Sequence, residues 1–543
     1  MGSQESSLSS GDDNKEHHVS ALDQDPNNAG AWHRLGLLLT PKEEITVAGK
    51  PHRKGLCYLK SVLADPLFAP SWHSLGMLLE QGEVVPIRGC PYNRVSCLSQ
   101  AVNVDPKVFQ YWYDLGGALD QAQEVFLHGV IHDKKSCYAT ACGFNKTDST
   151  VWVKLAFAMK SSDTVSVLGI EFTRSSCLAQ ALTFHTNRCD PATWYNLGVS
   201  LSGSEQVTLL EASYDKKGCY VSALLLDPTH FNAWYNLGVC LKPGDLVDIG
   251  GELYEKTDCY VRAITLNETN FNAWYNLGAV LKHGQEASIH GENYTSMLCY
   301  VRALHINPKH SACWFNLGLY LENNEEVMIS GKSYNKCLCF LQALQYDASQ
   351  AKMWFRLGIC MSSNEIAQVQ GINYTAKACL IKALQLDPSY LFAWVNMAEC
   401  LVGCEEEVLI GDVRYNKQRC LLRALELQPR TVSAWVALSK TIGENGQVQV
   451  PGEGSMQTPR SCLLRALELH PKFAQAWVML GIGLGPGEEV TVDGVTHTAR
   501  SCFEEAVRHD PRIEIPQHAS SVAVSKESPV LRIESVYYTT KML

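Results

Sequence analysis

The chain has 543 residues and a formal net charge of −10, from 46 lysines and arginines and 56 aspartates and glutamates. This acidic balance argues against general binding to nucleic-acid phosphates, which needs a basic surface. We find neither the apolar segment of a secretory signal nor a run of 18 apolar residues that would span a membrane, so we expect a cytoplasmic protein whose 21 cysteines are free thiols in a reducing compartment.

The first 15 residues are rich in serine, glycine, aspartate and asparagine, a composition typical of disordered segments. They begin Met1-Gly2-Ser3-Gln4-Glu5-Ser6, which matches the N-myristoylation pattern and makes Gly2 a candidate lipidation site. One myristoyl chain gives only marginal membrane binding, so the pattern predicts at most a weak association with a membrane surface. The segment from His17 to Pro26 then predicts a lone helix that opens the repeats.

Between residues 16 and 511, tryptophan recurs at intervals of 40 to 42 residues, and no tryptophan falls outside this series. A fixed period of this size indicates an array of one structural unit, in which each unit contacts mainly its neighbours. We therefore predict about twelve repeats. Their tryptophans are Trp32, Trp72, Trp112, Trp152, Trp194, Trp234, Trp274, Trp314, Trp354, Trp394, Trp435 and Trp477.

Each repeat begins with a predicted helix, here called helix A, of which AWYNLGVCL at 233–241 is typical. Trp234, Leu237 and Leu241 share one helical stripe because they are spaced by three and four residues. The residue four after the tryptophan is small in every repeat, as Gly238 is. A small residue inside a helix has a cost, so we expect another stretch of backbone to approach it closely.

The middle of each repeat predicts a tight β-hairpin. In DLVDIGGELYEK at 245–256, Val247 and Ile249 alternate with polar residues and precede Gly251, which suits a turn with positive φ. An acidic residue often stands eleven after the tryptophan and a basic residue twenty-two after it, as Asp245 and Lys256 do. With a two-residue turn these positions face each other, so we expect cross-strand ion pairs.

Each repeat ends with a second predicted helix, here called helix B. It carries a cysteine, an alanine four residues later and often a proline nine residues later, as in Cys219, Ala223 and Pro228. The recurring cysteines form no C-x2-C pair, so we expect structural thiols, no metal site and no cofactor. We also find no Walker loop, no G-x-S-x-G motif and no other catalytic constellation, and therefore expect no enzyme.

The pattern W-x-x-L-G-x-x-L followed by C-Y-x-x-A-L-x-L-x-P resembles the tetratricopeptide repeat over roughly residues 16–511. The resemblance implies a mainly α fold, a right-handed α-solenoid of about twelve repeats that binds protein segments rather than small-molecule substrates. The repeat here is about six residues longer than that family's 34, and the excess is the hairpin between helices A and B. In this the chain is similar to predicted kinetoplastid proteins with hairpin-bearing repeats.

In tetratricopeptide arrays helix A lines the concave groove, so the resemblance places the two residues after each tryptophan there. The W-[YF]-N-L-G run resembles the asparagine ladder in the repeats of the O-GlcNAc transferases, whose amides hold the backbone of an extended peptide. An amide donates and accepts at once, so it suits a peptide bond. We therefore expect a non-enzymatic scaffold that binds a protein or peptide segment. Its expected groove residues are Asn196, Asn236, Asn276, Asn316, Asn396, Tyr195, Tyr235, Tyr275 and Phe315.

Several alternatives stay open at this point. The asparagine amides can be merely solvated or bonded to their own helix. The chain can instead be a regulatory subunit of a larger complex, docked through its hairpins or its C-terminal tail. An RNA-binding helical repeat is the third alternative, and the acidic charge disfavours it. A groove that clamps a carboxylate or phosphate needs clustered lysines and arginines, which the central asparagine ladder lacks.

Residues 512–543 leave the repeat pattern. We expect them to form an extended or disordered tail. Whether this tail docks on the last repeat, docks in the groove or stays undocked is left open by the sequence.

Overall fold

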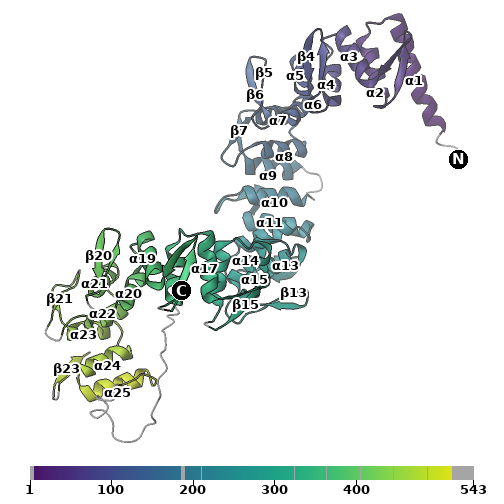
Figure 1. Cartoon of the computed structure of the whole chain (residues 1–543). Coiled ribbons are helices and arrows are strands. Elements are labelled where there is room, and N and C mark those ends of the chain that lie inside the picture. The colour runs from purple at the N-terminus through teal and green to yellow at the C-terminus, as the bar shows by residue number, and fades with distance from the viewer. Residues whose placement is uncertain are drawn as a thin grey trace. The chain divides into compact units, whose positions relative to one another are not determined.

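The computed structural model describes residues 5–184, 190–209, 211–322, 324–362, 364–403, 405–443, 446–485 and 487–515. The chain divides into an N-terminal unit, Met1 to Glu268, and a C-terminal unit, Thr269 to Leu543. In both units pairs of helices alternate with two-stranded hairpins (Figure 1). The candidate lipidation site Gly2 and the tail beyond residue 515 lie outside the described residues.

The N-terminal unit contains thirteen helices and six hairpins in the residues described. Its helices are α1 (Glu5–Gln24), α2 (Ala29–Leu38), α3 (Lys54–Ala64), α4 (Ala69–Leu78), α5 (Arg94–Val104), α6 (Phe109–Ala118), α7 (Lys134–Phe144), α8 (Ser149–Ala158), α9 (Arg174–Phe184), α10 (Pro191–Ser200), α11 (Lys216–Leu226), α12 (Phe231–Cys240) and α13 (Lys256–Leu266). Its strands are β1 (Glu44–Val47), β2 (Lys50–Arg53), β3 (Val84–Ile87), β4 (Cys90–Asn93), β5 (Glu124–Leu127), β6 (Val130–Asp133), β7 (Thr164–Val167), β8 (Ile170–Thr173), β9 (Val207–Leu209), β10 (Ala212–Tyr214), β11 (Val247–Ile249) and β12 (Glu252–Tyr254).

The C-terminal unit contains the remaining elements of the described chain. Its helices are α14 (Phe271–Val280), α15 (Ser296–Ile306), α16 (Ser311–Tyr320), α17 (Lys336–Tyr346), α18 (Ala351–Cys360), α19 (Ala376–Leu386), α20 (Leu391–Cys400), α21 (Lys417–Leu427), α22 (Val432–Ser439), α23 (Pro459–Leu469), α24 (Ala474–Ile482) and α25 (Ala499–His509). Its strands are β13 (Ala287–Ile289), β14 (Glu292–Tyr294), β15 (Glu326–Ile329), β16 (Lys332–Asn335), β17 (Ile366–Val369), β18 (Ile372–Thr375), β19 (Glu407–Ile410), β20 (Val413–Asn416), β21 (Val448–Gln449), β22 (Met456–Gln457), β23 (Glu489–Val492) and β24 (Val495–Thr498).

The expected order of helix A, hairpin and helix B is found in every repeat, and twelve repeats fit the chain. Within each unit consecutive helices pack against one another, as α10 and α11 or α16 and α17 do. The tryptophans are all buried in this packing. Helix B ends just before its proline. In α11 the last helical residue is Leu226, and Asp227, which precedes Pro228, has the extended conformation that a following proline favours.

The small residue of helix A is approached closely by helix B of the same repeat. A Cβ added to Gly278 in α14 would lie 3.1 Å from the backbone carbonyl oxygen of Ser296, as expected, whereas in several other repeats the nearest neighbour is a side chain. A Cβ added to Gly238 in α12 would lie 2.8 Å from Cε1 of Tyr260 in α13. The same holds for Gly318 in α16, where it would lie 2.8 Å from Cε1 of Phe340 in α17. An aromatic ring of helix B therefore packs directly on the backbone of helix A, and this close approach explains why the position stays small.

Each regular hairpin is anchored on the tryptophan of its own repeat. In the repeat of Trp234, the strands pair Val247 with Tyr254 and close through a two-glycine turn with positive φ at both residues. The ring of Tyr254 lies 4.9 Å from the ring of Trp234, centroid to centroid. Trp234 Nε1 donates to the carbonyl of Pro228 at 2.8 Å. The tryptophan thus joins helix A, the hairpin and the end of the preceding helix B.

The acidic residues eleven after the tryptophan do not form the expected cross-strand ion pairs. Asp245 accepts a hydrogen bond from the backbone N–H of Lys242 at 3.2 Å, and its carboxylate lies 3.6 Å from Nζ of Lys217 in the preceding helix B. These contacts lower the pKa of Asp245, with the backbone hydrogen bond the larger cause. Lys256 instead donates to the carbonyl of Leu241 at 2.8 Å, the open C-terminal end of helix A. The charges therefore link consecutive repeats and close helix ends.

The N-terminal helix is longer than composition suggested. Helix α1 begins at Glu5 and so extends through residues for which we expected disorder. Lys15 Nζ lies 2.6 Å from Glu43 Oε1, the same kind of link that joins Lys217 to Asp245. Because this partner is distant in sequence, local composition could not reveal the contact. In α25, the last helix described, Arg500 lies 3.1 Å from Glu504, and both side chains are exposed.

The recurring cysteines of helix B are buried free thiols, as expected. Burial raises the pKa of Cys259 to about 12, which keeps its thiol protonated and unreactive. One pair departs from the expectation of free thiols: Cys337 and Cys360 are joined by a disulfide. No helix of the described chain is long and apolar enough to cross a membrane. The same residues contain no cluster of three or more histidines, cysteines or carboxylates suited to a metal.

Candidate protein-binding surface on helices A

Helix A presents one continuous outer face, formed by residues two before, two after and five after the tryptophan. These positions follow the i, i+4, i+7 spacing of one side of a helix. In α12 they are Asn232, which is exposed, Asn236, which is half-buried, and Val239, which is 48% exposed. The predicted asparagines therefore lie in the middle of an accessible face, and the predicted aromatics border it.

In the N-terminal unit the ladder residues of neighbouring repeats hold each other. Asn236 donates from Nδ2 to the hydroxyl of Tyr195 at 3.2 Å, which joins α12 to α10. The ring of Tyr195 packs against His230 at 4.8 Å between centroids. Asn196 donates instead to the carbonyl of Ala192 in its own helix at 2.7 Å. Tyr235 is half-buried at the equivalent place and packs against Tyr260 at 6.1 Å.

The C-terminal unit repeats this arrangement once. Asn316 donates from Nδ2 to the hydroxyl of Tyr275 at 3.2 Å, and Tyr300 Oη lies 3.5 Å from the same nitrogen. Burial raises the pKa of Tyr275, so its hydroxyl keeps its proton and can donate it. Asn396 bonds to the carbonyl of Phe392 in its own helix at 2.8 Å.

Two further predicted residues of the C-terminal unit complete the ladder. Phe315 is 7% exposed and is thus mainly core, whereas Asn276 is half-buried. The structure thus agrees with the alternative of helix-bonded amides at Asn196 and Asn396. At Asn236 and Asn316 the amides join neighbouring repeats instead.

These contacts restrict what the asparagines can offer a ligand. The Asn236 and Asn316 amides use their N–H side toward tyrosine hydroxyls. No hydrogen bond to their Oδ1 atoms is found among the described residues, and an amide oxygen accepts two hydrogen bonds. The arrangement therefore suits a ligand that brings N–H donors, as an extended peptide backbone does.

Sequence reasoning missed an apolar row beside the ladder. The residue five after the tryptophan is apolar and 40–56% exposed in most repeats. In the N-terminal unit the row contains Leu37, Met77, Phe157, Val199 and Val239, and in the C-terminal unit it contains Leu319, Ile359 and Ile482. The signal was available, because this position lies three residues beyond the asparagine and hence on the same helical face. Exposed apolar side chains in a row provide contact area for a protein ligand.

The first repeats replace the neutral ladder with ionisable groups. His73 Nε2 lies 2.7 Å from Asp114 Oδ2, at the positions that Tyr195 and Asn236 occupy later in the same unit. Gln110 also donates to this carboxylate oxygen at 2.8 Å. Both side chains are largely withdrawn from water, with 19% of His73 and 11% of Asp114 exposed.

A basic pair stands in the C-terminal unit just after Asn316. Lys352 and Arg356 are one turn apart on the outer face of α18, and Nζ of Lys352 lies 5.3 Å from the Phe315 ring centroid. Lys336, at the start of α17, has a lowered pKa because of burial and, secondarily, repulsion by Arg356. The clustered cations that the central ladder lacks are therefore found one repeat later.

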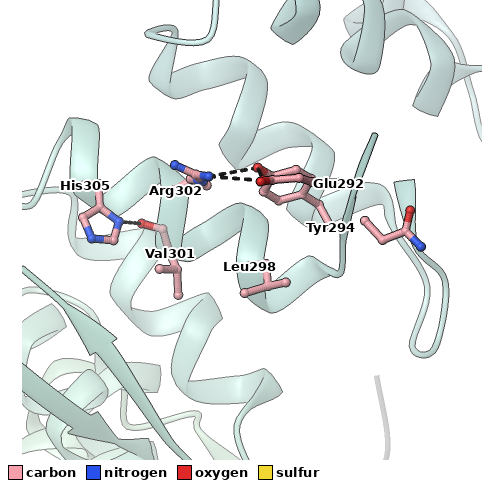
Figure 2. A pocket seen from close by; sticks show the side chains of 7 residues that line it. Glu292, Tyr294, Leu298, Val301, Arg302 and His305 are labelled. Atoms are coloured by element: carbon pink, nitrogen blue, oxygen red, sulfur yellow. Dashed lines mark hydrogen bonds and ion pairs between the residues drawn. The ribbon is translucent and has the colours of Figure 1, made fainter. Parts of the chain in front are cut away.

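A shallow crevice of about 330 Å³ lies between β14 and α15, outside the ladder (Figure 2). Its charges are already paired: Arg302 Nη2 donates to Tyr294 Oη at 3.0 Å and lies 3.5 Å from Glu292 Oε2. His305 Nδ1 lies 2.9 Å from the carbonyl of Val301. These contacts fix the hairpin on helix B and leave the crevice without a free charged group to recognise a ligand.

No protein-family model matches the sequence, and no curated protein matches it. Among solved structures 103 chains are similar to it. They include the crystal structure of the yeast Tom70, with 11% sequence identity and a TM-score of 0.25, in an alignment that covers 72% of this chain and 84% of that chain. A TM-score this low does not support superposition of the two chains, so the similarity adds nothing to a functional argument.

Proposed function

We propose that this chain is a non-enzymatic scaffold whose helices A bind extended protein segments. The observation that carries the proposal is the outer face of helix A, where an amide oxygen stands beside an exposed apolar side chain. In α12 these groups are Asn236 and Val239, and in α16 they are Asn316 and Leu319. An extended peptide would donate backbone N–H groups to the amides and rest its apolar side chains on the row.

The specificity of such binding would change along the C-terminal unit. Asn316 is neutral, whereas Lys352 and Arg356 of the next repeat place two positive charges on the same kind of face. We infer that a segment bound here has apolar residues at α16 and an acidic residue at α18. Charge complementarity of this kind supports orientation and association rate more than affinity.

The proposal is tested with a phage-displayed library of random linear peptides selected on the full-length protein. Peptides enriched on wild type are measured again on Asn316→Ala/Leu319→Asp, and we expect a loss of affinity of about tenfold or more, because both contacts are removed. Asn293→Ala is the matched control, since Asn293 is an exposed asparagine on the hairpin β13–β14. Equal binding by all three proteins would refute the proposal.

The two other functional classes make different predictions for the same peptides. A regulatory subunit that docks through hairpins would lose its partner on changes to the hairpin face and not on changes to α16. An RNA-binding repeat would shift single-stranded RNA in a gel, which the net charge of −10 disfavours. We expect no shift at physiological salt. We also expect at most weak association of the full chain with membranes, and only when Gly2 carries a myristoyl group.

A further inference from the structure

The disulfide of the C-terminal unit lies at the junction of two repeats. Cys337 is the second residue of helix B α17, and Cys360 is the last residue of helix A α18 in the following repeat. Their Cα atoms are 5.6 Å apart, a separation typical of disulfides. Both residues are partly exposed, whereas Cys339, the recurring cysteine of α17, is fully buried. This pair is therefore accessible to small thiols and disulfides in a way that the recurring cysteines are not.

Some other repeats place a cation where α17 has Cys337. In the N-terminal unit these cations pair with a carboxylate of the next repeat, with 3.4 Å between Lys135 and Asp163 and 3.6 Å between Lys217 and Asp245.

The C-terminal unit has the same link at two later junctions. It joins Lys377 to Glu406, and Arg460 to Glu488 at 2.5 Å. At the Cys337 junction the equivalent carboxylate, Glu365, accepts from the backbone N–H of Ser362, as Asp245 accepts from that of Lys242, but Cys337 stands in the position of the cation. The covalent bond thus stands in place of an ionic link between repeats.

The bond also holds the basic face of α18. Lys336 directly precedes Cys337, and Arg356 is one turn before Cys360 on the same side of α18. Lys352 is a further turn back along this helix. Closing or opening the bond therefore changes how firmly three cations of neighbouring helices are held together.

We propose that Cys337 and Cys360 are a reversible thiol–disulfide pair that locks α18 onto α17. Oxidised glutathione is a sufficient oxidant. The thiolate of one cysteine attacks the disulfide of oxidised glutathione, forms a mixed disulfide with one glutathione and releases the other as a thiol. The second cysteine attacks the mixed disulfide, forms the Cys337–Cys360 bond and releases the second glutathione thiol. Two protein thiols thus lose two electrons and two protons to one glutathione disulfide, and reduced glutathione reverses the exchange.

The test compares full-length wild type in glutathione buffers that are mainly oxidised or mainly reduced. Alkylation followed by peptide mapping should find Cys337 and Cys360 joined in the first buffer and free in the second. Hydrogen exchange of the α18 backbone should be slower by at least about tenfold in the joined state, because a cross-link restricts local opening. A pair that stays free in the oxidised buffer, or equal exchange in both states, would overturn the proposal.

Two variants separate this bond from other effects of oxidation. Cys360→Ser should show the same α18 exchange in both buffers. Cys400→Ser is the matched control, because Cys400 ends α20 as Cys360 ends α18 but is a free thiol, and the preceding helix B, α19, has Lys377 where α17 has Cys337. It should retain the wild-type difference between buffers. A difference that persists in Cys360→Ser would show that another thiol causes it.

Discussion

In the N-terminal unit, neighbouring helices A make a contact between equivalent positions in the early and in the late repeats, but with different side chains. His73 of α4 reaches Asp114 of α6 at 2.7 Å, and Tyr195 of α10 accepts from Asn236 of α12 at 3.2 Å. In both cases the residue one after a tryptophan meets the residue two after the next tryptophan. The stacking of helices A therefore determines which residues meet, and the side chains determine whether the contact is charged or neutral.

The difference has consequences for binding. The early pair uses its polar atoms on each other in a site withdrawn from water, so it stabilises the junction of repeats. The later pair is neutral and keeps an amide oxygen for a ligand. Binding capacity is therefore expected in the later repeats and stability linked to ionisation in the earlier ones.

The largest expected effect is the loss of a charge from the early pair. Asp114→Ala leaves His73 and Gln110 without their acceptor in a poorly hydrated site, so we expect the free energy of local opening of α4 and α6 to fall by about 2–3 kcal/mol. Asn236→Ala removes a neutral bond and should cost about 1 kcal/mol at α10 and α12. Native-state hydrogen exchange measures both. Equal costs would mean that the two chemistries are energetically equivalent.

A second comparison concerns a buried row of hydrogen-bonded side chains beside the early pair, formed by Ser61, Ser71 and His33 and here called the polar chain. Ser71 Oγ lies 3.1 Å from His33 Nδ1 and 2.6 Å from Ser61 Oγ, where later repeats have Ala233, Tyr195 and Ala223. Ser71→Ala alone should cost about 1–2 kcal/mol, because it leaves buried polar groups unbonded.

The combined variant Ser61→Ala/Ser71→Ala/His33→Tyr gives the early junction the residues of the later one. It removes the polar chain as a whole, so hydrogen exchange of α2 and α4 should stay within about 0.5 kcal/mol of wild type. A cost close to that of Ser71→Ala would show that the early repeats need the polar chain for their packing.

The early repeats should also be the more acid-sensitive. Burial lowers the pKa of His33 below 6.5, and repulsion by His73 and Arg34 lowers it further. The folded protein thus binds this proton less readily than the unfolded chain does, so the contribution is complete above pH 6.5 and is lost as the pH falls through the lowered value.

Hydrogen exchange measured between about pH 7.5 and pH 5, and corrected for intrinsic rates, should show weakening of α2 and α4 but not of α10, whose N-cap is Asp190 rather than a histidine. His33→Tyr should reduce this difference, because it removes the titrating group. Uniform acid weakening along the unit would assign the effect to other residues.

The smallest expected effect comes from one hydroxyl of the neutral pair. Tyr195→Phe keeps the ring packed on His230 but removes the acceptor of the Asn236 amide. Since Asn236 is half-buried and water can replace the hydroxyl, the cost at α12 should be about 0.5–1 kcal/mol. A cost above that of Asn236→Ala would indicate that the hydroxyl has a further role.

Much of the local structure was predictable, and the reason is visible in single residues. The spacing of Trp234, Leu237 and Leu241 predicts helix A, Gly250 and Gly251 suit the turn, and Pro228 marks the end of a helix B. The position of Asn236 on an accessible face follows from the same helical spacing. Each of these inferences depends on neighbours within about seven residues, where backbone geometry alone relates one side chain to the next.

The partners of the same side chains were not predictable from those spacings. Asp245 was expected to pair with Lys256 across its hairpin, and it instead lies 3.6 Å from Lys217 of the preceding repeat. The paired strands end at Val247 and Tyr254, Lys256 already belongs to α13, and its ammonium donates to the carbonyl of Leu241 at the open end of helix A. The expectation of free thiols failed at Cys337 for a similar reason, because its partner belongs to the next repeat.

The sequence by itself determined the period, the order of helix A, hairpin and helix B, and the residues that face outward, because these depend on short-range geometry repeated twelve times. Only the tertiary structure decided which residues meet between repeats: Asn236 with Tyr195, Asp114 with His73, and Cys337 with Cys360. These pairs are 23 to 41 residues apart, and their meeting depends on how one repeat stacks on the next. Stacking depends on the packing of helix B of one repeat on helix A of the next, as α11 packs on α12, and no local spacing describes this packing.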